Sequence, residues 1–134
     1  MTGTRTEIIP YLFYQDVPEA LAWLARAFGF AEDMRTGTPG GGMHAEMSFR
    51  GQRIMMGQPV DPGRWRMASP LGAGTATMGV FIYLDDVDAH HAEAAAAGAE
   101  IVEPPNDKPY GRTYTARDPE GHPWFFTTPP RDPE

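Results

Sequence analysis

Residues 8–32, IIPYLFYQDVPEALAWLARAFGFAE, and residues 79–103, GVFIYLDDVDAHHAEAAAAGAEIVE, share one layout. In each stretch, a short apolar run rich in β-branched and aromatic residues reaches an aspartate, Asp16 or Asp86. An alanine-rich run follows each aspartate and stops at a glycine. This order predicts a strand, a helix capped by the aspartate and a helix end at the glycine. The chain is therefore expected to contain two copies of one structural unit.

More strands are expected after each helix. Residues 43–49 alternate apolar and polar side chains, and residues 53–56 follow after a tight connection, which predicts a hairpin. Residues 112–117 and 123–127 are separated by the turn Asp118-Pro-Glu-Gly121, in which Pro and Gly occupy positions that β-turns prefer. Each unit is therefore predicted to consist of a strand, a helix and three further strands.

The length of the chain fits one domain built from these two units. A chain of 134 residues leaves little room for two independent cores. We expect one domain over residues 1–134, with module one at about 8–57 and module two at about 79–128. The intermodule loop, residues 58–78, is rich in Gly and Pro, and a loop this long usually has a function of its own.

Composition and charge exclude several classes of partner and chemistry. The formal net charge of −7 disfavours nucleic acid or an anionic membrane as a partner and favours a neutral or cationic ligand. The absence of cysteine excludes disulfides, thiolate metal sites and cysteine nucleophiles. The start, MTGTRTEIIP, lacks the basic and apolar runs of a secretory leader, and no apolar run is long enough to span a membrane. A cytoplasmic protein without a membrane or nucleic-acid partner is expected.

The two-unit layout resembles the vicinal oxygen chelate superfamily, which groups glyoxalases, bleomycin-resistance proteins and extradiol dioxygenases. The most specific string is residues 110–126, YGRTYTARDPEGHPWFF, which is similar to the last hairpin of many members. The resemblance runs from about Ile8 to Thr128. It implies an α+β fold in which two βαβββ modules form a curved eight-stranded mixed sheet around a cleft, with the helices outside.

Metal-dependent members of this superfamily place one His, Glu or Gln near the start of each module's first strand and one on its last strand. In this chain the resemblance places the first-strand positions on Ile9 and Val80, and the last-strand positions on Met55 or Met56 and on Phe125. A thioether is a poor ligand for a divalent ion, and an alkyl or phenyl group is none. The resemblance therefore implies a member of the metal-free, bleomycin-resistance-like branch, with no metal and no cofactor.

Apolar and aromatic side chains are expected to line the cleft where other members bind metal. The resemblance places there Tyr11, Phe13, Met56, Ile82 and Phe125, which otherwise would close an ordinary core.

Three further residues are candidate ligand contacts. Trp65, between two arginines of the intermodule loop, is expected either to cover a planar ligand or to plug the loop onto the body or onto a dimer partner. Tyr110 and Arg112 flank a glycine at the entry to a strand, where they would either contact the ligand or form only the turn.

The four histidines lie at three places in the chain. His44 and Glu46 lie two residues apart in a strand and therefore share a face, where they would form a polar network, contact a ligand, or act as an acid–base pair or metal ligands. His90 and His91 adjoin on a helix and are expected to be a surface residue and a packing residue. His122 follows the turn glycine and is expected to cap the hairpin or pack locally.

These observations favour a metal-independent protein that binds and sequesters a hydrophobic or planar, possibly cationic, small molecule such as an antibiotic. A homodimer is expected. The alternative is a glyoxalase-like isomerase, lyase or cyclase in which His44 and Glu46, or Tyr110, transfer protons. A third possibility is a metal enzyme with ligands at other positions.

Overall fold

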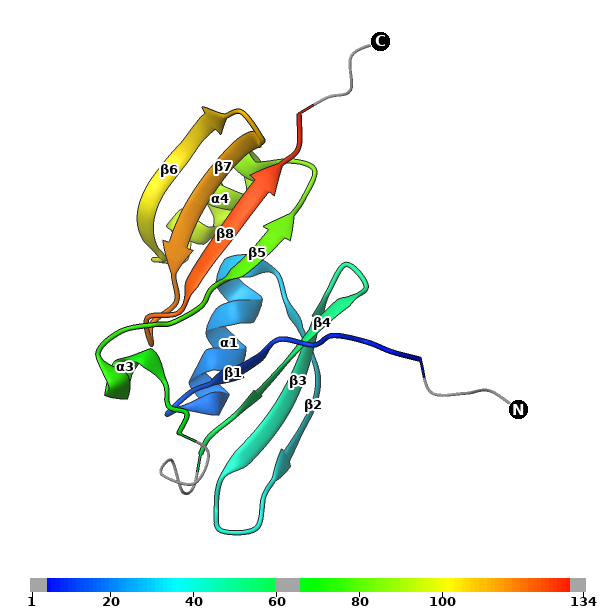
Figure 1. The fold of residues 1–134 in the computed structure, drawn as a ribbon, viewed down its shortest axis with the longest axis vertical. Coiled ribbons are helices and arrows are strands. Elements are labelled where there is room, and N and C mark those ends of the chain that lie inside the picture. Colours follow the sequence, from blue (N-terminus) through cyan, green and yellow to red (C-terminus); the bar gives the residue numbers. More distant parts are fainter. Residues whose placement is uncertain (1–4, 60–65, 131–134) are drawn as a thin grey trace.

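The computed structural model describes residues 5–59 and 66–130, which form two four-stranded sheets and three helices (Figure 1). In chain order the elements are β1 (Tyr11–Phe13), α1 (Val17–Phe28), β2 (Ala31–Gly37), β3 (Met43–Phe49), β4 (Gln52–Gly57), α3 (Pro70–Ala73), β5 (Val80–Tyr83), α4 (Val87–Ala96), β6 (Glu100–Lys108), β7 (Gly111–Arg117) and β8 (Pro123–Thr128).

The two sheets have the same topology. Their strand orders are β1-β4-β3-β2 and β5-β8-β7-β6. The pairs β1–β4 and β5–β8 are parallel, and the other neighbouring strands are antiparallel. The predicted two-module α+β architecture is confirmed. Within residues 5–59 and 66–130, the eight strands divide into two sheets of four, since no strand of one sheet pairs with a strand of the other.

The two long helices begin and end where the repeated pattern predicts. Asp16 Oδ1 accepts a hydrogen bond from the amide of Glu19, and Asp86 Oδ1 accepts one from Ala89, both at 3.1 Å. These bonds satisfy amides that have no partner inside the helix. After α1, Gly29 adopts a left-handed conformation with φ of 84°, which a residue with a side chain rarely adopts.

The core is one cluster to which both modules contribute. Helices α1 and α4 pack against each other, and Phe28 at the end of α1 contacts Trp124 and Phe126 of β8. Trp23 and Trp124 are buried in this cluster. Both helices lie on the core-facing side of the sheets, which leaves the opposite side of each sheet open to solvent.

The sequence pattern overestimates the length of the first strand. The run from Ile8 to Tyr14 predicts seven residues of strand, whereas β1 is three residues long. Pro10 has no amide hydrogen to donate, and the partner strand β4 ends at Gly57, opposite Phe13.

No helix in the described part of the chain is both long and apolar enough to cross a membrane.

Candidate functional site

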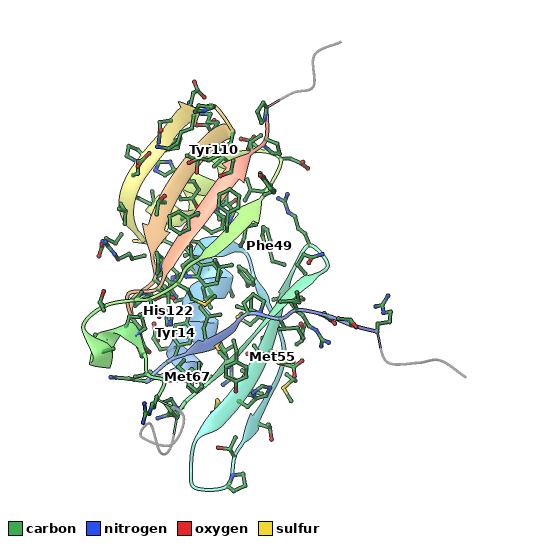
Figure 2. The ribbon with its side chains drawn as sticks, in the orientation of Figure 1. Tyr14, Phe49, Met55, Met67, Tyr110 and His122 are labelled. Atoms are coloured by element: carbon green, nitrogen blue, oxygen red, sulfur yellow. The ribbon has the colours of Figure 1, made fainter. Side chains whose placement is uncertain are left out.

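The first module has one face that is not covered by its helix, which we call the first open face. It is defined by side chains of β1, β3 and β4 that alternate with the core residues: Tyr11, Phe13, His44, Glu46 and Met55. Tyr11, Met55 and Glu46 lie opposite one another across the three strands, and so do Phe13, Gly57 and His44. Figure 2 labels Met55 on β4 within this sheet.

Gly57 lets Tyr11 reach across the sheet to His44. A Cβ atom at Gly57 would lie 2.5 Å from the Tyr11 hydroxyl, so no larger residue fits with the tyrosine in this position. The Tyr11 hydroxyl lies 2.9 Å from His44 Nδ1, and His44 Nε2 lies 3.3 Å from Glu46 Oε2. The glycine in β4 thus makes possible a chain of polar contacts on the first open face.

The chemistry of this polar chain follows from what each group can donate. A carboxylate only accepts hydrogen bonds, so His44 Nε2 carries the hydrogen that faces Glu46, and Nδ1 of the neutral ring accepts from Tyr11. Burial raises the pKa of Tyr11, and the negative charge of Glu46 raises it further, which keeps the phenol protonated as the donor. The side chains of His44 and Glu46 remain about a fifth exposed. Tyr11, His44 and Glu46 therefore form a connected polar group that a ligand can reach.

The second module also has an open face, and it is aromatic. We define the second open face by Phe81, Tyr83, Thr115 and Phe125, which are neighbours by strand register and alternation. The rings of Phe81 and Tyr83 lie 5.1 Å apart, and Phe81, Tyr83 and Phe125 are 47%, 60% and 36% exposed. Large aromatic side chains exposed together on one surface are typical of a binding surface.

Sequence reasoning identified Phe125 on this face but missed Phe81 and Tyr83. It placed Ile82 with Phe125, and the strand register shows that this prediction is wrong: Phe125 pairs with Phe81, whereas Ile82 pairs with the buried Phe126. Because side chains alternate along a strand, the register decides which set faces solvent. The pairing of β5 with β8 shows which β5 side chains are exposed, and the sequence of β5 alone does not reveal that pairing.

The placement of Met56 in the lining is also wrong. Met56 is fully buried in the core, where its register partners Leu12 and Ala45 are buried too. Its neighbour Met55 lies on the first open face instead. Ile82 likewise packs against the core cluster.

The remaining candidates are distributed over other parts of the molecule. Arg112 forms ion pairs with Asp88 of α4, at 3.0 Å, and with Asp107, at 3.2 Å, so its charge is engaged on the helix side of the sheet. Tyr110 is exposed at the turn between β6 and β7, at the opposite end of β7 from His122 (Figure 2). Trp65 lies outside the described residues.

The residues at the four metal positions of the resemblance do not fit a divalent ion. Ile9, Met55, Val80 and Phe125 offer no hard or nitrogen donor. Within residues 5–59 and 66–130, no group of three or more His, Asp or Glu side chains is placed to hold a metal ion.

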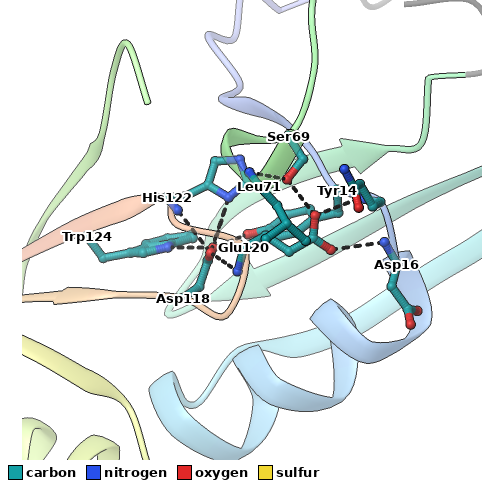
Figure 3. Close-up of polar contacts among 9 residues, drawn as sticks. Tyr14, Asp16, Ser69, Leu71, Asp118, Glu120, His122 and Trp124 are labelled. Carbon is teal, nitrogen blue, oxygen red and sulfur yellow. Dashed lines mark hydrogen bonds and ion pairs between the residues drawn. The ribbon is translucent and has the colours of Figure 1, made fainter. Parts of the chain in front are cut away.

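A buried polar cluster joins the two modules (Figure 3). The Asp118 carboxylate, in the turn between β7 and β8, accepts hydrogen bonds from the Tyr14 hydroxyl at 2.6 Å, Trp124 Nε1 at 3.1 Å and His122 Nδ1 at 3.1 Å. It also accepts from the amides of Glu120 and His122. Burial alone would raise the pKa of Asp118, but the hydrogen bonds and charge of His122 and the bonds from Tyr14 and Trp124 outweigh it and lower that pKa. The expectation that His122 is bound locally in the hairpin is confirmed.

Glu120 extends this cluster to the start of α1 and to the intermodule segment. Its carboxylate accepts from the amides of Gln15 and Asp16, at 2.6 and 2.9 Å, and from the Ser69 hydroxyl at 2.5 Å. The sequence motif Asp-Pro-Glu-Gly-His therefore does more than turn the chain. It holds the first module, the residues before α3 and the last hairpin together.

A pocket of about 500 Å³ lies beside this cluster. Three segments line it: β1, residues 66–80 and the start of β8 with His122. Tyr11 and Phe13 belong both to the pocket and to the first open face, so the two adjoin.

Comparison with known proteins identifies the family. The family model described as the Glyoxalase/Bleomycin resistance protein/Dioxygenase superfamily matches residues 6–126. The chain is similar to the crystal structure of TioX from Micromonospora sp. ML1, at 35% identity and a TM-score of 0.70, over 96% of this chain and 100% of that one.

Two further solved structures have the same fold at lower identity. The bleomycin-binding protein from bleomycin-producing Streptomyces verticillus, solved with copper(II)-bleomycin, is 22% identical, with a TM-score of 0.67, over 96% of this chain and 100% of that one. TnmS3, an antibiotic binding protein from Streptomyces sp. CB03234, is 18% identical, with a TM-score of 0.68 and the same coverage. At these identities the likeness shows the fold alone.

Proposed function

The chain belongs to the Glyoxalase/Bleomycin resistance protein/Dioxygenase superfamily, and from this premise we propose that it is a metal-independent protein that binds and sequesters a small planar or hydrophobic molecule. The observation that carries the proposal is the aromatic second open face. Phe81, Tyr83 and Phe125 expose large ring surfaces next to one another, and aromatic rings bind planar ligands by stacking and apolar contact. The absence of ligating side chains at the four metal positions supports binding without a metal.

The two open faces differ in a way that suits one ligand between them. The second face offers apolar rings, and the first offers the hydrogen-bonding chain of Tyr11, His44 and Glu46. Small-molecule sites usually combine a mainly apolar lining with a few placed polar groups. In this proposal the rings supply most of the contact area, and the polar chain selects and orients the ligand.

A homodimer is part of this proposal. Within a single chain both open faces are accessible to solvent, and a second copy would cover them. Symmetric pairing would enclose two equivalent clefts, each with one first face and one second face. The net charge of −7 favours a neutral or cationic ligand in such a cleft.

The structural relatives support an antibiotic as the ligand class. Two proteins of the same fold are named for binding bleomycin and an antibiotic, respectively. TioX is 35% identical to this chain over nearly its whole length.

Isothermal titration of the purified protein with a panel of glycopeptide, quinone and other planar aromatic antibiotics tests this proposal. We expect one class to bind, with one site per chain, and EDTA to leave the affinity unchanged. Tyr83→Ala should weaken binding about tenfold, because aromatic stacking and burial contribute about 1–3 kcal/mol. A matched control is Tyr110→Ala, which removes another exposed tyrosine, at the turn between β6 and β7, that belongs to neither face. Absence of binding across the panel, or equal loss in both variants, contradicts the proposal.

The connected chain of Tyr11, His44 and Glu46 favours a second candidate function, a glyoxalase-like isomerase, lyase or cyclase. His44, held between a phenol and a carboxylate, is arranged as a general base would be. In that case turnover of a carbonyl substrate should survive EDTA and be lost in both His44→Ala and Glu46→Ala. Turnover that persists in both variants would remove these residues from the mechanism.

A further inference from the structure

The pocket beside the Asp118 cluster has a charge that contrasts with the rest of the protein. The chain carries a net charge of −7, yet among the residues that the structure describes (5–59 and 66–130) no aspartate or glutamate lines this pocket. The ionisable side chains that line it are Tyr11, Arg66 and His122. Met67, Met78 and Val80 are among its apolar lining residues. A mainly apolar pocket that also contains a guanidinium group and an imidazole suits an organic anion with an apolar body.

His122 lines this pocket, and its ring is held by Asp118. Its Nδ1 is directed at the Asp118 carboxylate, which fixes the ring and places the Nδ1 hydrogen on that side (Figure 3). Within residues 5–59 and 66–130, Nε2 has no hydrogen-bond partner, and no fully buried side-chain nitrogen there lacks one. The His122 side chain is 11% exposed and lines the pocket.

The support behind His122 is rigid. Asp118 is held by Tyr14, Trp124 and two backbone amides, all of which are buried with it. A carboxylate that is fixed in this way holds the orientation of the imidazole, so that Nε2 is directed away from Asp118. Arg66, an exposed residue that also lines the pocket, supplies a positive charge.

From this geometry we infer that the pocket is a second binding site, for a small organic acid whose apolar body lies against Met67, Met78 and Val80 and whose carboxylate binds His122 Nε2 and Arg66. The volume of about 500 Å³ is enough for a single aromatic or branched aliphatic acid. The site adjoins the proposed cleft through Tyr11 and Phe13, but it does not use the aromatic second open face. Its ligand chemistry also differs from that of the cleft, since it favours an anion.

The test compares benzoate with benzyl alcohol, a neutral molecule of similar size, by NMR titration of the ¹⁵N-labelled protein. We expect benzoate to shift the amide signals of Gly79 and His122 in saturable fashion and to leave those of Tyr83 and Thr115, which do not line the pocket, unchanged. Benzyl alcohol should bind about tenfold more weakly, because a hydrogen bond to a charged group contributes about 1.5–3 kcal/mol.

Two variants report on the two carboxylate contacts. His122→Asn keeps an amide N–H near Asp118 but removes Nε2, and we expect it to weaken benzoate binding about tenfold. Arg66→Gln does not touch the Asp118 cluster, and we expect a loss of about two- to fivefold, as for an exposed charge pair. Arg26→Gln is the matched control, since it removes the same charge from the exposed side of α1 and should not change the affinity.

The inference is overturned if benzoate does not bind, if benzyl alcohol binds equally well, if the shifts occur at Tyr83 and Thr115 instead, or if Arg66→Gln binds benzoate as the unaltered protein does. Should His122→Asn fail to fold, Arg66→Gln decides the question by itself. The result is separable from the proposed function. Tyr83→Ala should impair binding of the planar compound and leave benzoate binding intact, because Tyr83 does not line the pocket.

Discussion

Two regions of the molecule combine a tyrosine, a histidine and a carboxylate but differ in burial: Tyr14, His122 and Asp118 between the modules, and Tyr11, His44 and Glu46 on the first open face. The Asp118 side chain is 1% exposed and accepts bonds from five donors, whereas the Glu46 side chain is 21% exposed and has few partners. The same three groups therefore hold the modules together in one place and remain available to a ligand in the other.

Removing the two carboxylates should give the largest contrast. Asp118→Ala leaves a buried phenol, an indole N–H and an imidazole without their acceptor, and we expect a loss of about 3–5 kcal/mol in the free energy of unfolding. Glu46→Ala should cost no more than about 1 kcal/mol, because its contacts are partly exposed. Urea unfolding of both variants measures the difference. Similar losses would show that burial does not separate the two regions.

The two tyrosines give a finer version of the same contrast. Tyr14→Phe removes a buried donor to a charged carboxylate, and we expect a loss of about 1.5–3 kcal/mol in the free energy of unfolding. Tyr11→Phe should cost about 0.5 kcal/mol at most, since water replaces the hydroxyl at an exposed site. Thermal unfolding followed by circular dichroism checks both. A Tyr11 variant as unstable as the Tyr14 variant would contradict the assignment of Tyr11 to a ligand surface.

Gly57→Ala tests whether close approach across β4 makes the exposed polar chain possible. The new methyl group would lie 2.5 Å from the Tyr11 hydroxyl and force the ring away from His44, at a cost of about 1 kcal/mol or more. Gly37→Ala in β2 is the control, because nothing lies within 4 Å of its added Cβ. Chemical denaturation should show a loss only for Gly57→Ala, and the loss should shrink in the Tyr11→Phe background. Equal stability of the two alanine variants would refute the contact.

A third histidine, His90, contacts a tyrosine, Tyr114, without a carboxylate partner among the described residues, and it can be compared with the two groups above. His90 Nδ1 faces the Tyr114 hydroxyl, and Nε2 donates to the carbonyl of Phe28 at 2.9 Å. Burial lowers the pKa of His90, and the charge of Arg50 also lowers it, while the bond to Phe28 and the charge of Glu93 oppose the shift.

The pH dependence of His90 should be the smallest effect. Because its pKa is lower in the folded than in the unfolded protein, the unfolded state binds more protons below pH 6.5, and stability is lost as the pH falls. Comparison of the protein with His90→Gln by urea unfolding at pH 7.5 and pH 5 isolates this contribution. We expect the advantage of the histidine to shrink at pH 5. An advantage that is the same or larger at pH 5 would contradict the direction of the shift.

Much of the fold could be predicted because local features determine it. The aspartates and glycines that begin and end α1 and α4 act within a few residues, and the alternation of β3 is visible in its own sequence. The site was predicted less well. His44 and Glu46 share a face of their strand, and Tyr11 and Phe13 share a face of theirs, as their spacing implies. Met56 and Ile82 were assigned to the wrong face, because strand register depends on the partner strand.

The sequence by itself determined the repeated βαβββ unit and the ends of its two long helices, since residue identity and short-range spacing suffice for both. The lack of ligating residues at the metal positions followed from the sequence together with the family resemblance. Only the tertiary structure decided which aromatic rings are exposed. It also showed that the missing side chain at Gly57 lets the Tyr11 hydroxyl reach His44, and that the Asp-Pro-Glu-Gly-His turn joins both modules. The physical reason is that burial and pairing depend on contacts between residues far apart in the chain. Asp118 and Tyr14 are 104 positions apart and yet form a 2.6 Å hydrogen bond.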